Sequence, residues 1–258
     1  MVLKMKFEEA YSISHHSNYT IEEIAKIHEK SLETYVTDYK GYFACPECRE
    51  AKLNFVNSKP CYFRTEQDDS HNDDCSLKQL TMSAHQTEGF VSNTENKEKI
   101  GRQLQSIMTM LLSDKPTAVR TTRVQSNATS SKKQSSSVSE SFREKQVPRK
   151  RIDTKFRNED YDCYKFFYGK VRAVWEKDEK RPEYMKLLLF HAKESRLLCR
   201  IYITGKVFSH IPQPYKDLNQ KVCEIAFLAS FDSNRNSTEK SYQSTSLRFG
   251  HFFILNHP

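Results

Sequence analysis

The last hundred residues alternate apolar and polar positions in a way that predicts a β-rich domain. Five runs are rich in β-branched, aromatic and aliphatic residues, and polar turns separate them. The runs are YKFFYGKVRAVWEK, MKLLLFHA, RLLCRIYITG, KVCEIAFLASFD and SLRFGHFFILN. Between the third and fourth lies HIPQPYKDLNQ, with room for a short helix or a long loop. Five strands with a connection at this point match the count and order of an OB-fold, and a small sandwich or another half-barrel also fits.

The beginning of the chain is patterned as a strand followed by a helix. Leu3, Met5 and Phe7 alternate with lysines, which predicts a strand. Thr20 precedes the run IEEIAKIHEKSLETYV, and Glu23 stands three residues after it. This spacing is typical of a capping box, so we expect a helix to begin directly after Thr20.

A second helix is expected to begin at Asn93 or Thr94 and to end at Leu112. One of its faces carries an apolar stripe formed by Ile100, Leu104, Ile107, Met108 and Leu111. We expect this stripe to pack against the N-terminal part of the chain. The alternative is that the 94–112 helix binds a protein partner or forms a dimerisation surface.

The composition changes sharply after residue 112. Residues 113–157 contain few apolar side chains and many Ser, Thr, Lys and Arg, so they cannot bury enough surface to offset the entropy of ordering. We therefore predict a flexible basic linker here, a module at 1–112 and a β-rich domain at 158–258.

The charge is distributed unevenly over these three parts. The chain carries +8 in total. Residues 1–112 hold 13 Lys and Arg against 17 Asp and Glu, residues 113–157 hold 12 against 4, and residues 158–258 hold 16 against 12. The net charges are therefore −4, +8 and +4. Attraction to phosphates is expected from the linker and the C-terminal domain rather than from the acidic N-terminal module.

Two groups of residues are candidates for nucleic-acid contacts. The first lies in the PRKR sequence at the end of the linker, which would act as a disordered basic arm and comprises Arg149, Lys150 and Arg151. The second would lie on one barrel face, with rings stacking on bases and cations following the backbone, and comprises Tyr168, Lys170, Arg172, Arg200 and Tyr202. The alternatives are a solubilising tether and the ordinary solvent face of a sheet.

Four residues near the N-terminus have the spacing of a zinc site. Cys45 and Cys48 form a Cys-x-x-Cys knuckle, and His71 and Cys75 follow as a His-x-x-x-Cys pair. Three thiolates and one imidazole complete a tetrahedron and leave no position for water or substrate, which indicates one structural Zn²⁺. Cys61 replacing His71 or Cys75 as a ligand, a disulfide, and unpaired thiols are the alternatives. Seven cysteines and the lack of a signal peptide favour a reducing, cytoplasmic environment.

These residues resemble the N-terminal zinc module of CoiA-like bacterial competence proteins. The resemblance lies in CPEC, KPCYFRTE and DSHNDDC and covers roughly the first 80 residues. Cys45 and Cys48 match the knuckle of that family, and His71 and Cys75 match its closing pair. Tyr62 stands where the family often carries a histidine, as does Thr65. The resemblance implies a role in competence, mobile-element or phage-related DNA handling in bacteria.

The sequence lacks the motifs of common enzymes. It has no Gly-rich phosphate loop, no His-Glu-x-x-His and no nucleophile elbow, and no clustered acidic and lysine residues typical of a nuclease. No apolar run reaches the length of a membrane span, so we expect no membrane partner. The predicted class is α+β: a small zinc-stabilised N-terminal α/β module, a flexible basic linker and an all-β, OB-like or half-barrel C-terminal domain. The predicted function is a non-enzymatic accessory protein that binds nucleic acid, with single-stranded DNA favoured over RNA. A protein-interaction adaptor is the alternative, and a divergent nuclease is less favoured.

Overall fold

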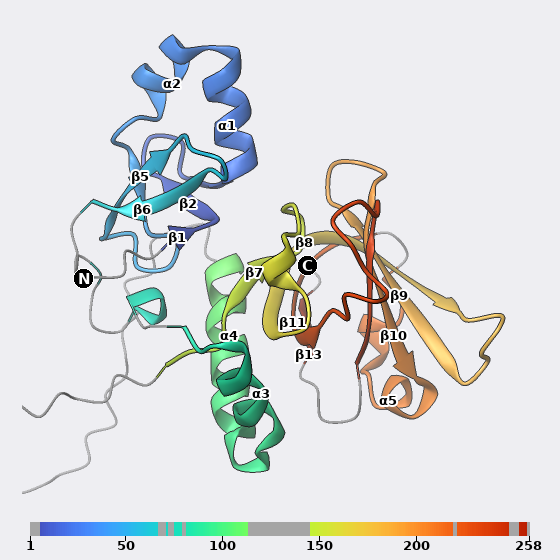
Figure 1. Cartoon of the computed structure of the whole chain (residues 1–258). Coiled ribbons are helices and arrows are strands. Elements are labelled where there is room, and N and C mark those ends of the chain that lie inside the picture. The colour runs from blue at the N-terminus through green and yellow to red at the C-terminus, as the bar shows by residue number, and fades with distance from the viewer. Residues whose placement is uncertain are drawn as a thin grey trace, which may run out of the picture.

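Two β-sheets organise the chain (Figure 1). The structure, a computed structural model, describes residues 6–66, 71, 75–78, 81–112, 145–218, 221–247 and 253–256. Leu3 and Met5 of the predicted first strand and residues 113–144 of the predicted linker lie outside the described residues. The expected α+β class is confirmed in this coarse form, with an N-terminal mixed module and a curled, β-rich C-terminal half.

The first sheet belongs to the N-terminal module, residues 6–78. Every neighbouring pair of its strands is antiparallel. In spatial order the strands are β1 (Lys6–Phe7), β6 (Tyr62–Thr65), β5 (Lys52–Val56), β4 (Phe43–Ala44), β2 (Glu9–Ser12) and β3 (Ser17–Thr20). Phe43, Leu53 and Phe63 are almost fully buried between this sheet and its helices. The module also contains a short 3-10 helix, η1 (Ser76–Lys78).

The predicted capping box is confirmed, but the helix that follows it is divided in two. Thr20 Oγ1 accepts a hydrogen bond from the Glu23 amide at 3.2 Å, and Glu23 Oε2 accepts one from the Thr20 amide at 2.9 Å. Helix α1 (Ile21–Lys30) ends at Ser31, which is extended and caps α2 (Leu32–Asp38). A serine side chain competes for backbone donors, so it favours ending one helix and starting the next.

The second sheet curls into a half-barrel. Its strands are β7 (Arg149–Arg151), β8 (Tyr164–Lys177), β9 (Tyr184–His191), β10 (Leu197–Thr204), β11 (Val222–Ser230), β12 (Gln243–Leu247) and β13 (Phe253–Asn256). Strands β8, β9 and β10 form an antiparallel meander, β12 runs parallel to β10, and β11 and β13 continue the sheet on the other side of β8. Thr245 of β12 donates a hydrogen bond to the Ser230 carbonyl of β11 at 2.9 Å. The first four predicted runs are therefore strands, and the fifth overlaps the last two residues of β12 and contains β13.

The half-barrel encloses the largest apolar core. Phe167, Leu189, Ile201, Ile225 and Phe231 are fully buried in it. The connection between β10 and β11 contains two short helices, α5 (Gly205–Ser209), which precedes the stretch HIPQPYKDLNQ, and η4 (Gln213–Tyr215), which lies within it, where a short helix or a long loop was expected. A further 3-10 helix, η3 (Asn158–Asp160), precedes β8.

The apolar helix packs on the half-barrel and not on the N-terminal module. Helices α3 (Ala84–Ser92) and α4 (Lys97–Leu112) are joined by η2 (Thr94–Asn96). The predicted stripe on α4 is buried against the outer face of β8 and β11, where it contacts Phe166, Tyr168, Ala226 and Leu228. The expectation that it packs on the N-terminal module was wrong, and the stripe is not free to bind a partner. These helices belong with the C-terminal sheet, so the predicted boundary at residue 112 falls on the wrong side of them.

The last part of the predicted linker is ordered. Residues 145–157 cross the beginning of β8, and β7 pairs with it in parallel, with Lys150 opposite Phe167. Val147 and Ile152 are 1% exposed. A Cβ at position 169 would approach Ile152 Cγ2 to 3.2 Å, so Gly169 allows this close crossing. The prediction that the linker is flexible up to residue 157 was wrong. The few apolar residues of this last part are separated along the sequence, but each of them is buried.

Candidate metal centre and candidate nucleic-acid interface

The four predicted metal ligands meet in one buried cluster. Cys45 directly follows β4, and its knuckle turn leads into β5, with the Cys45 amide donating to the Ala51 carbonyl at 2.7 Å. Arg49 closes the turn with a φ of 59°, and its amide donates to the Cys45 carbonyl. His71 and Cys75 come from the segment after β6 and are 5% and 2% exposed. The β4–β5 hairpin thus presents two ligands to the pair that follows the sheet.

The ligand atoms have the spacing of a tetrahedral site. Cys45 Sγ lies 3.8 Å from Cys75 Sγ, and His71 Nδ1 lies 3.5 Å from Cys48 Sγ and 3.3 Å from Cys75 Sγ. A tetrahedron with zinc–sulfur bonds of about 2.3 Å and a zinc–nitrogen bond of about 2.0 Å has edges of about 3.8 and 3.5 Å. All four ligand atoms lie within 4.8 Å of one another. The cluster can therefore hold a metal ion, and the donor set fits zinc.

Burial and mutual hydrogen bonds shift the pKa values of the clustered thiols in different directions. Burial raises the pKa of the Cys45 thiol well above its ordinary value. Hydrogen bonds from Cys45 and Cys75 lower the pKa of Cys48. A divalent cation would allow all three sulfurs to ionise.

The other cysteines take no part in this cluster. Cys61 donates a hydrogen bond to Asn57 Oδ1 at 3.6 Å, and the group of potential ligands found among the described residues does not include it. All seven cysteines are free thiols, so the disulfide alternative is not seen. Cys199 and Cys223 are buried in the half-barrel core.

The knuckle is tied to the rest of the chain through Glu47. Its carboxylate accepts a hydrogen bond from Ser106 of α4 at 3.3 Å and forms an ion pair with Arg149 of β7 at 3.4 Å. The side chains of Arg149 and Glu47 are only 8% and 16% exposed. The turn between Cys45 and Cys48 is thus one of the contacts between the N-terminal module and the half-barrel.

The predicted basic arm is a buried set of ion pairs. Lys150 Nζ lies 2.7 Å from Glu8 Oε1 and 3.4 Å from Asp160 Oδ2, and its side chain is 2% exposed. Arg151 Nη1 lies 2.6 Å from Glu9 Oε2. With Arg149 on Glu47, each of the three consecutive cations pairs with an acidic residue of the N-terminal module. The prediction of a disordered phosphate-binding arm was wrong for Arg149, Lys150 and Arg151.

The surrounding carboxyl groups respond to this burial in different ways. Burial raises the pKa of Glu8 despite the nearby Lys150 ammonium. Burial also acts to raise the pKa of Asp160, but Lys150 and Lys165 outweigh it, and the pKa of Asp160 is lowered. Asp160 forms a second direct ion pair, with Lys165 at 2.7 Å, and also accepts a hydrogen bond from the Arg157 amide at 2.7 Å.

The predicted residues of β8 do not form an open binding face. Tyr168 is buried under α4, and its hydroxyl donates to Glu9 Oε1 at 2.5 Å, so its ring cannot stack on a base. Lys170 is half-exposed and pairs with Glu224 at 3.4 Å. Arg172 donates to the carbonyls of His191 at 3.4 Å and Glu194 at 2.5 Å, which holds the β9–β10 turn.

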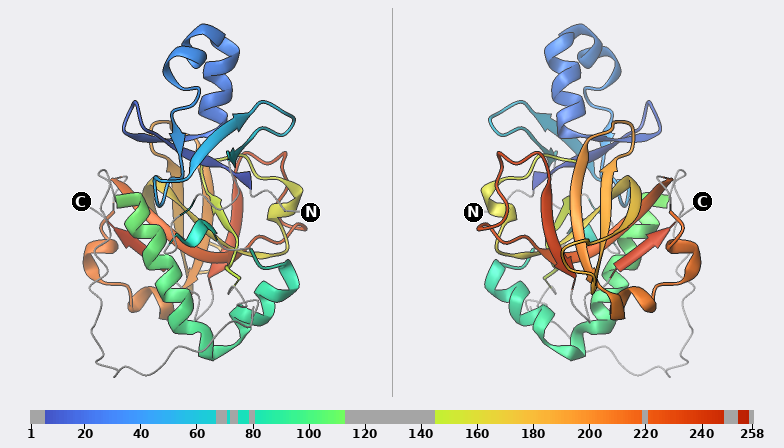
Figure 2. Two further views of the ribbon diagram at one scale, coloured as in Figure 1. Left: turned by 90° about the vertical axis from the view of Figure 1, so that its left-hand side faces the viewer. Right: turned by 90° about the vertical axis from the view of Figure 1, so that its right-hand side faces the viewer.

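Arg200 and Tyr202 lie on a different part of the half-barrel. They are half-buried on the outer face of β10, and the strand register places Leu188 and Lys186 of β9 opposite them. Helices α3 and α4 pack over β8, β11 and β13 instead. Figure 2 shows α4 in front of the half-barrel in one view and β9 and β10 in front in the other.

The outer face of β9 and β10 contains further residues that the sequence reasoning missed. The Arg181 guanidinium lies 4.6 Å from the ring centroid of Tyr202 and 5.0 Å from that of Tyr184. The Arg200 guanidinium lies 4.8 Å from the centroid of Tyr242. We call this surface the β9–β10 face; its residues are Arg181, Tyr184, Lys186, Leu188, Phe190, Arg200, Tyr202 and Tyr242. The consecutive apolar residues of MKLLLFHA predict a strand but do not show which side chains of β9 lie on the outer face, and no local pattern marks Arg181 and Tyr242, which lie in loops.

No described helix is long and apolar enough to cross a membrane. Comparison of the chain with models of protein families, with curated proteins and with solved structures finds no match.

Proposed function

We propose that this protein is a zinc-stabilised, single-stranded nucleic-acid-binding protein whose β9–β10 face binds the strand. The strand order supports an OB-like assignment, because an OB barrel has a three-stranded meander, a fifth strand parallel to the third and a fourth strand beside the first. Strands β8 to β12 follow this order, with helical turns between β10 and β11. OB domains bind oligonucleotides on the face of their second and third strands, which correspond here to β9 and β10.

The observation that carries the proposal is the pairing of cations with aromatic rings on the β9–β10 face. Arg181 lies over two tyrosines, and Arg200 lies over a third. Exposed rings stack on bases of any sequence, and guanidinium groups neutralise phosphates between them. From Tyr184 to Phe190 the face is about 20 Å long at the rise of a β-strand, which is room for a few nucleotides.

Zinc is proposed as the resident ion of the Cys45 cluster, in a structural role. Its four protein ligands would leave no position for a substrate. The proposal assigns no catalytic step to the chain. A place in competence, mobile-element or phage-related DNA handling is proposed on the CoiA-like motif residues alone.

The test is the salt dependence of binding to a fluorescent oligodeoxythymidine. We expect the logarithm of the association constant to fall with the logarithm of salt concentration, with a slope of about −2 for three neutralised phosphates. The R200A/Y202A variant should lose at least about 1 kcal/mol of binding free energy per lost stacking contact. The R64A/Y42A variant removes the same residue types from the exposed surface of the N-terminal module and should bind like the wild type.

Two results would overturn the proposal. One is a wild-type protein that does not bind the oligonucleotide even at about 50 mM salt. The other is an R200A/Y202A variant that binds as tightly as R64A/Y42A while both unfold at the wild-type urea concentration. An oligoribonucleotide of the same length, measured in parallel, decides between DNA and RNA.

A further inference from the structure

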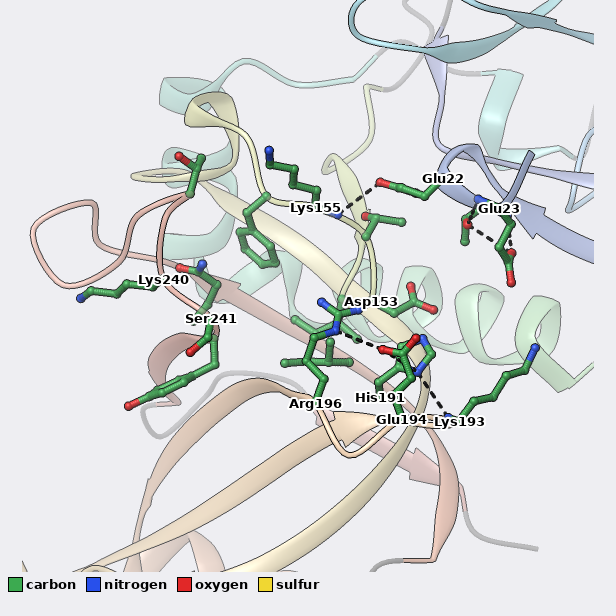
Figure 3. A pocket seen from close by; sticks show the side chains of 18 of the residues that line it. Glu22, Glu23, Asp153, Lys155, His191, Lys193, Glu194, Arg196, Lys240 and Ser241 are labelled. Atoms are coloured by element: carbon green, nitrogen blue, oxygen red, sulfur yellow. Dashed lines mark hydrogen bonds and ion pairs between the residues drawn. The ribbon is translucent and has the colours of Figure 1, made fainter. Parts of the chain in front are cut away.

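A cleft of about 570 Å³ lies between helix α1 and the rim of the half-barrel (Figure 3). One wall is the first turn of α1, and the other is formed by the β9–β10 turn and by the loop that leads into β12. Residues 152–156 run between the two walls. The volume is within the range of about 300–1,000 Å³ that is usual for small-ligand sites.

Cations from the β9–β10 turn, from residues 152–156 and from the loop before β12 line this cleft. Arg196 lies within it, and its Nε is 3.4 Å from Glu194 Oε2, while its two Nη groups make no hydrogen bond or ion pair with a described residue. Lys155, Lys193 and Lys240 stand around it in Figure 3. The ammonium groups of Lys155 and Lys193 have no carboxylate partner in the part of the chain that the structure describes. A guanidinium fork with free Nη donors matches the geometry of a phosphate.

Four acidic residues line the cleft, and one of them, Glu194, pairs with Arg196 itself at 3.4 Å. Glu23 accepts the capping hydrogen bonds of Thr20, and Asp153 forms a pair with Arg151 at 2.6 Å. Glu22 accepts a hydrogen bond from the Lys155 amide at 3.3 Å. Glu22 Oε2 makes no hydrogen bond with a described residue, and none of the four carboxylates forms an ion pair with Lys155 or Lys193 in the described part of the chain.

The cleft continues into the β9–β10 face. Tyr242 lines the cleft, and the Arg200 guanidinium lies 4.8 Å from the centroid of its ring. Apolar contacts are present too, because Ile152, Phe156 and Leu198 contribute to the lining. A phosphate-binding fork, an aromatic ring and an apolar surface in one cleft are the groups that a nucleotide requires.

We infer that this cleft binds one nucleotide of the strand that lies on the β9–β10 face, with its phosphate on Arg196. The strand would cross the face from Tyr202 past Arg200 and reach the cleft at Tyr242. This inference rests on the proposed function for the strand, but the nucleotide site stands on its own residues. Helix α1 forms one wall, so the N-terminal module takes part in binding through its shape.

The experiment measures two probes on the full chain, dAMP by calorimetry and the fluorescent oligodeoxythymidine by anisotropy. We expect R196A to weaken both by roughly 10- to 100-fold, since a hydrogen-bonded charge pair is lost. R196K keeps the positive charge without the guanidinium fork, so its affinity for both probes should lie between those of R196A and the wild type. R64A, a matched arginine on the exposed surface of β6, should leave both unchanged. R200A/Y202A should weaken the binding of the oligonucleotide more than the binding of dAMP.

The outcomes separate the inference from the proposed function. If the wild type binds dAMP through Arg196 but does not bind the oligonucleotide, the nucleotide site is supported and the strand-binding function fails. If R196A weakens the binding of dAMP but not the binding of the oligonucleotide, the cleft binds free nucleotides. The inference that the strand enters the cleft is then refuted. If dAMP does not bind and R196A binds the oligonucleotide like R64A, the inference fails while the β9–β10 face remains supported.

Discussion

Replacing Lys150 by methionine is expected to destabilise the contact between the two halves of the protein, and by an amount that depends on pH. The Lys150 side chain is 2% exposed, and its ammonium group lies 2.7 Å from Glu8, 3.4 Å from Asp160 and 2.9 Å from the Lys155 carbonyl. At these distances and an effective dielectric constant of about 20, the two ion pairs amount to about 6 and 5 kcal/mol before desolvation is subtracted. Removing one member of a buried pair typically costs about 3–5 kcal/mol.

We expect the lower end of that range for K150M. Asp160 keeps Lys165 at 2.7 Å, so Glu8 is the carboxylate that loses its partner. The Glu8 side chain is 23% exposed, and water therefore compensates part of the loss. The expected decrease in the free energy of unfolding at about pH 8 is about 3 kcal/mol.

The penalty should shrink in mild acid. Burial already raises the pKa of Glu8 above its ordinary value of 4.5, and removing Lys150 takes away the main opposing influence. A carboxyl group whose pKa is raised in the folded state stabilises that state below its unfolded pKa, and this contribution is lost as pH rises through the folded pKa. The difference between K150M and wild type should thus be smaller near pH 5 than near pH 8.

Urea unfolding at both pH values measures this effect. K155M is the matched control, because it removes an exposed lysine five residues away and should change stability by less than about 0.5 kcal/mol. E8Q/K150M should recover part of the loss, since the unpaired charge is gone. A K150M penalty below about 1 kcal/mol, or one equal at both pH values, would refute the reasoning that a buried unpaired Glu8 is the cause.

The remaining predictions concern the metal centre and the buried tyrosine. One zinc per chain is expected by atomic absorption; C48S should lose it, whereas C61S should retain it, and the reverse result would show that the ligand set is wrong. Chelation should lower the free energy of unfolding of the N-terminal module, because metal binding contributes directly to folding in small sites of this kind. Y168F removes the hydroxyl that donates to Glu9 and should cost about 1.5 kcal/mol, the low end for a bond to a charged group, since Arg151 still pairs with that carboxylate. A Y168F variant as stable as the wild type in urea would contradict this role.

Local signals predicted local structure well. Thr20 and Glu23 form the capping box that their spacing indicated, and β8 has the bounds of the first apolar run. The clustering of Cys45, Cys48, His71 and Cys75 was also predictable, because each pair is close in sequence and three cysteines with one histidine are a usual ligand set of structural zinc. Ser31 shows the limit of this reasoning, since one polar residue divided a run that otherwise favours a single helix.

The partners of each element were not predictable in the same way. The stripe on α4 indicates only that the helix is buried, and the choice between two sheets depends on contacts distant in sequence. β7 was not predictable from composition, because Val147, Ile152 and Phe156 are separated by charged residues. Those charged residues are themselves buried in ion pairs. Tyr168 alternates correctly for an outer face, but α4 covers that part of the face.

The pairing of Arg149, Lys150 and Arg151 with Glu47, Glu8 and Glu9 has a consequence for how the chain could be divided. Helix α4 before residue 113 packs on the half-barrel, and residues 145–151 pack on both sheets. A cut between residues 113 and 144 would therefore separate two pieces that share a buried apolar helix interface and a row of ion pairs. Residues 1–112 and 145–258, produced together as separate polypeptides, should assemble into one complex, which makes this protein a candidate for split-reporter designs.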